Sequence, residues 1–232
     1  MCTNYLETQV GNHIRLIERK DFEETIKMIS DNLYALWLHN LKNYFRKNTN
    51  TQIILLAVTT ALMILLDEDI WTFIFIILAQ ESSLALACVL KFYRDIGNEL
   101  KDLRPFGVVA KKHTKFWVLD GIINNQKQIV GSVALATPDG EVYDQKTTVA
   151  LKRLSVTPIL RRMKIGSRML EHAIQQATKL GFQRMVLYCG DRQQPALKLY
   201  KKYGFEITKI IDRTILSVLP DVPILCMEKQ LR

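Results

Sequence analysis

Two long apolar runs dominate the hydrophobic pattern of the chain. Residues 53–66 are interrupted only by two threonines, and residues 70–90 only by Thr72 and a short polar group that includes Glu81. Three acidic residues, 67–69, separate the runs. As a helix, the first run would span roughly 21 Å of a hydrocarbon core that is ~30 Å thick, whereas the second run is long enough to cross it. The pattern therefore predicts two apolar helices joined by an acidic turn.

The two runs allow two interpretations: buried helices of a soluble core, or a hairpin that enters a bilayer and returns. Basic flanks with an acidic turn favour the hairpin, because they are typical of segments whose two ends stay in the cytoplasm. The basic residues are Lys42, Arg46 and Lys47 before the runs and Lys91 and Arg94 after them. Glu81 is costly in lipid unless it is protonated, paired or turned toward the partner helix. The short first run also leaves a re-entrant hairpin open.

We expect residues 52–90 to form this membrane-associated hairpin. Residues 1–12 are expected to be a flexible segment, without the apolar run of a signal peptide. Residues 14–17 read as a strand, and Asp21 with Glu24 has the spacing of a capping box at a helix start. The helix that follows repeats apolar residues on one face: Phe22, Ile26, Ile29 and Leu33.

Beyond the hairpin, strand-like and helix-like segments alternate. Strands are expected at residues 116–119, 128–136, 150–156, 184–189, 206–211 and 223–228. Helices are expected at residues 165–180, ended by Gly181 as a C-cap, and at residues 195–203, followed by Gly204. In the first of these helices a stripe that faces the core comprises Met169, Ala173, Ile174 and Ala177. The alternation indicates a mixed α and β domain.

Composition narrows the class of protein. The chain has 232 residues, 48% hydrophobic, and its 32 Lys and Arg against 23 Asp and Glu give a net charge of +9. These values exclude collagen-like and mostly disordered chains and suit one domain of moderate size. The scattered cysteines, Cys2, Cys88, Cys189 and Cys226, favour a reduced, cytosol-facing protein without a zinc site. The charge suits an anionic partner, but the basic residues are dispersed, so no nucleic-acid partner is expected.

The junction between residues 150–156 and the helix at 165–180 carries the strongest candidate chemistry. Pro158 stops the strand, and a loop with two arginines leads to a helix start at residues 164–167. Backbone N–H groups at a helix N-terminus attract anions, and the basic side chains add positive charge. The arrangement suits a pyrophosphate. The alternative is an ordinary strand–loop–helix connection with basic surface residues.

Two segments together resemble the GNAT (Gcn5-related) N-acetyltransferases. The first is similar to the acetyl-CoA-binding motif of the family at Val156, Pro158, Arg161, Gly166 and Leu170. The second is similar to the closing motif of the family, with Gln193 where asparagine is usual, then Ala196, Leu199, Tyr200, Gly204 and Phe205. The segments lie in the order that the family has, with a predicted strand between them.

The position of the hairpin narrows the resemblance to the camello-like branch. That branch includes membrane-anchored cysteine-conjugate and aspartate N-acetyltransferases of the endoplasmic reticulum, and the strand with Arg153 looks more like the aspartate-acetylating members. The resemblance covers about residues 13–229. It implies an α/β (α+β) GNAT acyl-CoA N-acyltransferase fold, with a mixed, mostly antiparallel sheet flanked by helices. This domain would occupy residues 13–232, interrupted by the hairpin at 52–90.

The resemblance implies acetyl-CoA as co-substrate and no metal. The CoA pyrophosphate would be held by Arg161, Arg162, Met163, Lys164, Ile165, Gly166 and Ser167. The pantetheine arm would pair with the strand through Leu154 and Val156, and Gln193 and Tyr200 would complete the cofactor site. Lys164 departs from the glycine of the family. It keeps the N–H donor and adds bulk, so it either adds a phosphate contact or weakens cofactor binding.

Tyr200 matches the general acid of the family, which protonates the departing thiolate, although core packing is the alternative. No base is identified, because the strand carries Lys152 and Arg153 where a glutamate is frequent. Arg153 is a candidate partner for a substrate carboxylate, or else a solvated strand residue. Four further residues are expected to be structural or exposed: Cys189 buried, His172 on the surface, and Glu141 and Asp144 in solvent.

The sequence thus predicts a membrane-anchored N-acetyltransferase of the endoplasmic reticulum, with its catalytic domain facing the cytoplasm. Its acceptor would be the amine of a small amino-acid-like molecule, either an amino acid or a cysteine S-conjugate. Two alternatives remain open: a protein lysine N-acetyltransferase, and a catalytically weak interaction module on the membrane, which Lys164 and the missing base favour. The sequence leaves the oligomeric state open.

Overall fold

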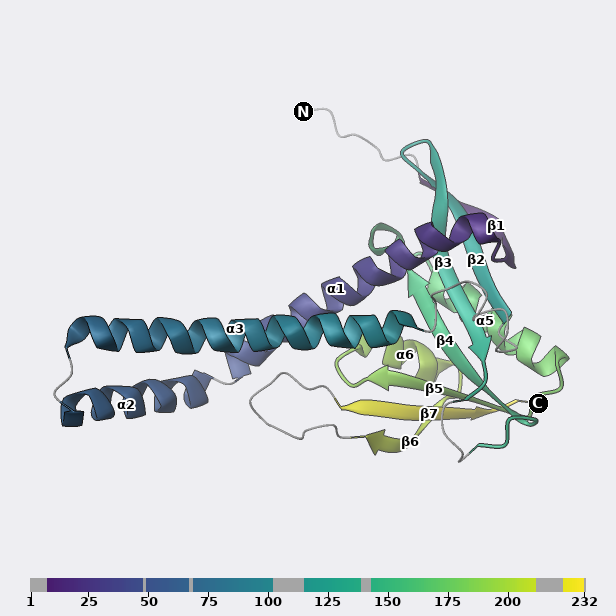
Figure 1. Ribbon diagram of the computed structural model, residues 1–232. Coiled ribbons are helices and arrows are strands. Elements are labelled where there is room, and N and C mark those ends of the chain that lie inside the picture. Colours follow the sequence, from purple (N-terminus) through teal and green to yellow (C-terminus); the bar gives the residue numbers. More distant parts are fainter. Residues whose placement is uncertain are drawn as a thin grey trace. The chain divides into compact units, whose positions relative to one another are not determined.

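The computed structural model describes residues 8–47, 49–66, 69–101, 115–138, 143–211 and 223–231 (Figure 1). The chain forms two compact units. The sheet unit comprises Met1–Leu33, Leu100–Thr214 and Val222–Arg232, and the helical unit comprises Tyr34–Glu99 and Ile215–Asp221.

A seven-stranded sheet in the order β1-β2-β3-β4-β5-β7-β6 forms the centre of the sheet unit (Figure 1). The strands are β1 (Thr8–Leu16), β2 (Lys115–Ile123), β3 (Gln126–Ala136), β4 (Thr148–Val156), β5 (Arg184–Gly190), β6 (Glu206–Ile211) and β7 (Ile224–Gln230). Every neighbouring pair is antiparallel except β4 and β5. The predicted mixed, mostly antiparallel sheet is therefore confirmed. Residues 8–12, expected in a flexible segment, instead lie in β1 as an edge strand beside β2.

The hairpin between β2 and β3 turns later than the sequence analysis predicts. The pairing continues to Ile123 and Gln126, so the turn consists of Asn124 and Asn125 alone. Their φ angles are 53° and 60°. Asparagine tolerates this left-handed region better than most residues, and two such residues give a tight turn whose twist matches that of the strands. The turn chemistry therefore fixes the register of β2 against β3.

Helix α1 (Phe22–Lys47) begins after a 3₁₀ turn, η1 (Arg19–Asp21). The expected capping box of Asp21 with Glu24 is wrong. Asp21 instead accepts the N–H of Glu18 at 2.8 Å and closes the preceding turn, which moves the cap three residues toward the N-terminus. Glu24 reaches the sheet, where its Oε1 accepts the N–H of Ile129 at 2.8 Å.

Arg15 on β1 ties the start of α1 to β2. Its Nε and Nη2 donate to the two carboxylate oxygens of Asp120, each at 2.9 Å. Its Nη1 and Nη2 donate to Asp21 at 2.5 and 2.9 Å. These bonds lower the pKa of both Asp21 and Asp120, and they raise the pKa of Arg15. One cation therefore neutralises two part-buried carboxylates.

Replacing Arg15 with methionine is expected to lower the free energy of unfolding by about 3 kcal/mol, because both carboxylates lose the guanidinium, and Asp120 keeps, among the described residues, only its ion pair with Lys127. The folded pKa of each carboxylate lies below its unfolded value, so the stabilisation is fully present above about pH 4 and is lost as the pH falls through the folded values. Urea unfolding from neutral pH into acid measures this, with Lys20→Met as a control on the exposed pair with Glu18. A difference between Arg15→Met and wild type that stays constant into acid would contradict this explanation.

Helices cover both faces of the sheet. On one face, Ile26, Met28 and Ile29 of α1 pack against residues of β2 and β3. On the other face lie α5 (Ile165–Lys179) and α6 (Gln194–Lys202), whose buried residues share one core cluster with residues of β2, β3, β4, β5 and β7. The predicted core stripe of α5 is confirmed: Met169, Ala173 and Ala177 are buried and Ile174 is partly buried. These contacts place the start of α5 beside the end of β4.

The helical unit contains α2 (Thr49–Leu66) and α3 (Ile70–Lys101), which confirms the two predicted apolar helices and extends both. Asp69 caps α3, since its Oδ1 accepts the N–H of Thr72 at 2.7 Å. Tyr34, in the later part of α1, stacks edge-on against Phe92 of α3, with ring centroids 5.6 Å apart.

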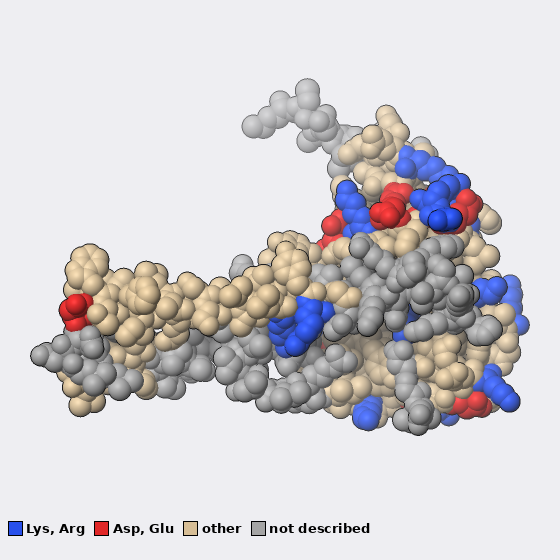
Figure 2. All heavy atoms as spheres, in the orientation of Figure 1, with Lys and Arg blue, Asp and Glu red and all other residues tan. Residues whose placement is uncertain are grey.

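Apolar side chains of α3 lie in solvent. Within the described residues, one helical segment, Ile70–Arg94, is long and apolar enough to cross a membrane by its length and composition. It has 25 residues and a mean hydropathy of 2.1, with 7% of its apolar window buried. Trp71, Phe75 and Leu78 are 75%, 72% and 60% exposed. Figure 2 shows the described atoms of this helix as a long uncharged stretch, with acidic atoms at its beginning.

Candidate active site

The candidate site lies where β4 and β5 separate. The two strands are parallel and pair only through residues 148–150 with residues 184–186. β4 then continues to Val156 and β5 to Gly190 without further pairing between them. The strands therefore diverge toward their C-terminal ends, and no other strand of the described part of the chain pairs with the edge of β4 beyond Ala150 on that side, where an extended ligand could pair.

The end of β4 directs backbone groups into this opening. The N–H of Thr157 donates to the carbonyl of Val130 on β3 at 3.0 Å. Because hydrogen-bond directions alternate along an antiparallel pair, the N–H of Val156 points away from β3. A bulge lies just before this point, where the register shifts between Ser132 and Ala134 and Arg153 has a φ of 58°. The hydroxyl of Ser132 donates to the carbonyl of Arg153 at 2.9 Å and fixes the bulge.

A short loop joins β4 to α5. After the 3₁₀ turn η2 (Pro158–Leu160), the side chains of residues 161–164 are exposed, while Leu160 and Ile165 are buried and hold the two ends of the loop on the core. The N–H groups of Ile165, Gly166 and Ser167 have no backbone acceptor in the described part of the chain, as expected in the first turn of a helix. The loop thus brings together all seven residues predicted to hold a pyrophosphate, in an arrangement that suits an anion.

Lys164 takes the backbone conformation that a glycine would supply. Its φ and ψ are 60° and 10°, in the left-handed region, and Arg162 also has a positive φ of 68°. The lysine therefore keeps the loop geometry at the cost of backbone strain of about 1 kcal/mol. Its added bulk does not close the loop, because its side chain is exposed.

Relieving this strain is expected to stabilise the protein. Lys164→Gly should raise the free energy of unfolding by up to about 1 kcal/mol, because glycine adopts a positive φ freely. Lys164→Ala removes the same charge but keeps the Cβ, so it serves as the matched control and should leave stability close to wild type. Urea unfolding of the two variants measures the difference. Equal stabilities for the glycine and alanine variants would show that the left-handed backbone carries no strain.

Tyr200 of α6 lies buried near the end of β5. Its ring packs edge-on against Phe205, with centroids 5.8 Å apart. Burial, with a smaller contribution from Cys189, raises the pKa of Tyr200, so its phenol keeps its proton at physiological pH. Tyr200 is therefore a core residue, and its role as general acid stays a prediction.

Cys189 and Gln193 adjoin Tyr200. The thiol of Cys189, buried as predicted, donates to Oε1 of Gln193 at 3.3 Å. Burial, assisted by Asp191, raises the pKa of Cys189 to about 12. A protonated thiol is a poor nucleophile. This geometry gives Cys189 a structural role and orients the side chain of Gln193 at the start of α6.

Two residues that the sequence analysis does not select also belong to this region. Asn32 of α1 hydrogen-bonds to the end of β4 and to Arg161. Asp191, directly after β5, has a buried Oδ1 that lacks a hydrogen-bond partner among the described residues. The sequence does contain a signal for Asn32, because it is a polar residue that follows Ile29 by three positions and so lies on the apolar face of its helix. Asp191 gives no comparable signal.

The outcomes for the other residues that the sequence analysis names differ. Arg153 is half-buried in the bulge of β4, and its substrate-binding role stays a prediction. The surface expectation for His172 is wrong, because its ring packs edge-on against Trp117 at 5.2 Å and burial lowers its pKa. Asp144 is exposed as predicted, and Glu141 lies outside the described residues. Across the described ranges, no group of three or more His, Cys, Asp or Glu side chains could hold a metal ion.

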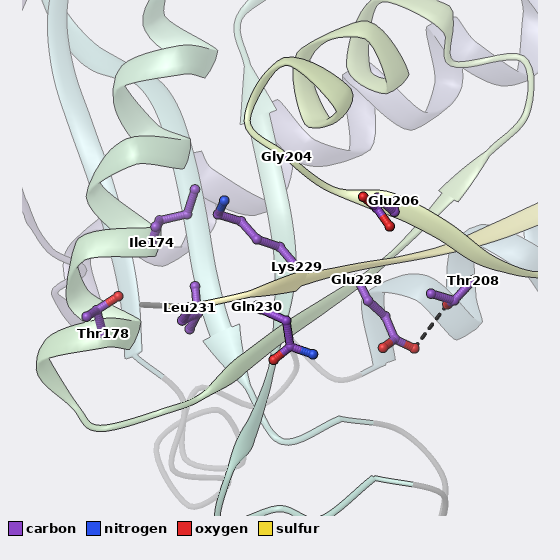
Figure 3. Close-up of a pocket in the computed structure, with 9 residues that line it drawn as sticks. All are labelled: Ile174, Thr178, Gly204, Glu206, Thr208, Glu228, Lys229, Gln230 and Leu231. Carbon is purple, nitrogen blue, oxygen red and sulfur yellow. Dashed lines mark hydrogen bonds between the residues drawn. The ribbon is translucent and has the colours of Figure 1, made fainter.

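A separate hollow of about 610 Å³ lies at the edge of the sheet (Figure 3). Glu228 and Gln230 of β7 line it together with Lys229 and Leu231, although successive residues of a strand point to opposite faces. The hollow forms where β7 extends past the start of β6 at Glu206. Its polar groups do not converge on one point, and Glu228 is already bonded to Thr208 at 3.0 Å. The residues predicted for the cofactor lie elsewhere.

Comparison with known proteins identifies the family to which the chain belongs. The family model described as "Acetyltransferase (GNAT) family" matches residues 84–205, more than half of the chain. The chain belongs to the GNAT acetyltransferase family, as the resemblance of its motifs indicates.

Individual relatives agree with the camello-like branch. N-acetyltransferase family 8 member 3 of Rattus norvegicus is 32% identical over 124 residues, 53% of this chain and 52% of the relative. Probable N-acetyltransferase camello of Xenopus tropicalis is 30% identical over 97 residues, 41% of this chain and 40% of the relative. The chain thus matches about half the length of these relatives. A crystal structure of a GNAT-family acetyltransferase from Staphylococcus aureus Mu50 has the same fold, with a TM-score of 0.52 and 19% identity over 95% of this chain and 99% of the other.

Proposed function

We propose that this protein is an acetyl-CoA-dependent N-acetyltransferase that acts on the amine of a small amino-acid-like molecule. The observation that carries the proposal is the separation of β4 from β5 directly beside the N-terminus of α5. An extended arm with an anionic end fits this arrangement, since the strand edge offers backbone groups and the helix start offers N–H donors. Membership of the acetyltransferase family supports the same reading.

The pyrophosphate of acetyl-CoA would lie on the N–H groups of residues 164–167, between the exposed guanidinium groups of Arg161 and Arg162, whereas the N–H of Met163 already donates to the carbonyl of Leu160 at 3.4 Å. The left-handed backbone at Lys164 supports this placement, because it leaves the loop in the form that glycine would give it. The pantetheine arm would follow the edge of β4 beyond Ala150, with Leu154 and the N–H of Val156 as its contacts on the strand and Gln193, directly before α6, as a further contact.

The reaction would be a direct transfer. The free amine of the acceptor attacks the thioester carbonyl, the new C–N bond forms, the C–S bond breaks, and CoA leaves as a thiolate. Tyr200 would donate its phenolic proton to that sulfur and regain a proton from solvent, since the buried phenol carries its proton at physiological pH. The proton lost by the amine would pass to solvent. Cys189 is unsuited to an acyl-enzyme route because its thiol stays protonated.

Arg153 would bind the carboxylate of the acceptor. It lies in the bulge at the point where β4 leaves β5, half-buried, which supports a place beside the transferred acetyl group. A guanidinium suits a carboxylate because it offers a planar fork of donors. An amino acid or a cysteine S-conjugate would satisfy this pairing, whereas a lysine side chain in a protein would not supply the carboxylate.

The apolar hairpin would anchor the catalytic domain, residues 13–232 with the interruption at 52–90, to a membrane. The exposed apolar surface of α3 supports this, because soluble proteins rarely expose a contiguous apolar patch of this kind. The segment Ile70–Arg94 would be ~37 Å long as a helix, enough for a ~30 Å hydrocarbon core. The basic flanks would keep both ends on the cytoplasmic side, at the endoplasmic reticulum.

Calorimetric titration of the detergent-solubilised chain with acetyl-CoA tests the cofactor site. We expect saturable binding, and at least tenfold weaker binding of acetyl-pantetheine, because that analogue lacks the pyrophosphate that the loop would hold (about 1.4 kcal/mol per tenfold). Equal affinities would remove the loop from the cofactor site, and no binding of either compound would overturn the proposed function.

A further inference from the structure

Asn32 is a polar residue on the face of α1 that packs against the sheet. It follows Met28 by four residues and Ile29 by three, and both of these are buried in the contact with β2 and β3. Residues at these spacings share one side of a helix. An amide in such a place is destabilising unless its donors and acceptor are all bonded. The hydrogen-bond partners of Asn32 therefore indicate which role a polar side chain has on this face of α1.

Among the described residues, the side chain of Asn32 bonds only to residues that adjoin or belong to the proposed cofactor site. Its Nδ2 donates to Oγ of Ser155 at 2.6 Å and to the carbonyl of Val156 at 3.2 Å. Its Oδ1 accepts Nη2 of Arg161 at 2.6 Å. One side chain thus spans the end of β4 and the loop before α5, across more than 120 positions of the sequence.

These bonds have a consequence at each end. At β4, the bond from Nδ2 of Asn32 fixes the carbonyl of Val156 and with it the plane of the peptide between Val156 and Thr157. This peptide lies at the end of β4, where β4 has separated from β5. Arg161 is exposed, and the bond to Nη2 restrains a side chain that otherwise loses about 2 kcal/mol of rotamer entropy when it binds an anion. The other N–H groups of this guanidinium have no partner in the described part of the chain, so they are available for a phosphate.

We propose that Asn32 is a positioning residue for the acetyl-CoA site, which holds Arg161 and the end of β4 in the form that binds the cofactor. The inference rests on the proposed function. It adds α1, outside both motifs of the cofactor site, to the elements that determine affinity for acetyl-CoA. Asn32 does not touch the reacting atoms, so its effect falls on cofactor binding and leaves the chemical step unchanged.

The test is a thermodynamic cycle on acetyl-CoA binding with Asn32→Ala, Arg161→Ala and the double variant. Asn32→Ala should weaken acetyl-CoA binding about tenfold, the loss expected for a hydrogen bond that involves a charged group. Turnover at saturating acetyl-CoA should stay within about twofold. With Arg161 already replaced, removing Asn32 should weaken binding less than about threefold, because the two residues act together. Asp31→Ala, the exposed neighbour on α1, is the matched control and should bind as wild type does.

Asn32→Asp separates the two ends of the network. Aspartate keeps an acceptor for Arg161 but loses both donors, so its affinity for acetyl-CoA should lie between those of wild type and Asn32→Ala. Should the alanine variant not fold, the aspartate variant and Ser155→Ala carry the test, each with an expected loss of about threefold. Wild-type affinity in a folded Asn32 variant, or the same tenfold loss with Arg161 replaced, would overturn the inference. Both outcomes require that wild type binds acetyl-CoA, whereas failure of the proposed function would appear as no binding by wild type.

Discussion

Replacing Tyr200 with phenylalanine is expected to lower turnover by about 10²–10³-fold, the range for loss of a positioned general acid. Binding of acetyl-CoA should change by less than about threefold, because phenylalanine keeps the edge-on packing against Phe205 and removes only the hydroxyl. Steady-state kinetics at saturating acetyl-CoA, with calorimetry for the affinity, measure the two effects separately.

Tyr203→Phe is the matched control for this experiment. Tyr203 lies at the end of the same helix and loses the same hydroxyl, which donates to Glu171 at 2.6 Å on an exposed surface. Its turnover should stay within about twofold of wild type. If Tyr200→Phe turns over as fast as Tyr203→Phe, Tyr200 is a core residue alone, and the proton for the thiolate comes from elsewhere.

Placing lysines on the exposed face of α3 is expected to release the protein from membranes. In the triple variant Ile74→Lys, Phe75→Lys and Leu78→Lys, each lysine adds about 2.5–3.5 kcal/mol to the free energy of insertion, roughly 9 kcal/mol together. The three side chains are exposed, so the substitutions leave packing within the protein intact. Fractionation after a carbonate wash should move the variant from the membrane pellet to the supernatant.

Three lysines at exposed positions, Gln175 and Thr178 of α5 and Leu180 directly after it, supply the matched control. That variant gains the same charge and should stay in the pellet. If the α3 variant also stays in the pellet with an unchanged circular dichroism spectrum, the hairpin does not anchor the protein. If the α3 variant unfolds, its apolar face belongs to a core, which is the alternative interpretation of the two apolar runs.

Local patterns in the sequence predict most of the elements. The predicted bounds of α5 agree with the structure within one residue at each end, because a core stripe and the C-cap at Gly181 mark the helix independently. The end of the β2–β3 hairpin is not predicted correctly, because Gly121 and Ile122 are as compatible with a turn as with a strand. The pairing of Ile123 with Gln126 is needed to show that Asn124 and Asn125 alone form the turn. The capping box is wrong for a related reason, since the 3₁₀ turn before α1 supplies a different partner for Asp21.

The part of the candidate site that consists of one contiguous segment can be predicted from the sequence. The loop of residues 161–167 is contiguous, so its motif alone is enough to group the predicted pyrophosphate contacts. The part that depends on distant pairing is not predictable. The early end of the β4–β5 ladder, the bulge at Arg153 and the bond from Asn32 to Arg161 each join segments whose contact no local pattern encodes.

Release of CoA thiol from acetyl-CoA, followed over a panel of amines, directly tests whether this protein acetylates a small amine that bears a carboxylate. The panel would contain amino acids, cysteine S-conjugates, their decarboxylated analogues and lysine peptides, with the full chain in detergent and Tyr200→Phe as the inactive reference. We expect release with a small amine that bears a carboxylate and little release with its decarboxylated analogue. Release with lysine peptides alone, or acetyl-CoA binding without release on any amine, would contradict this expectation.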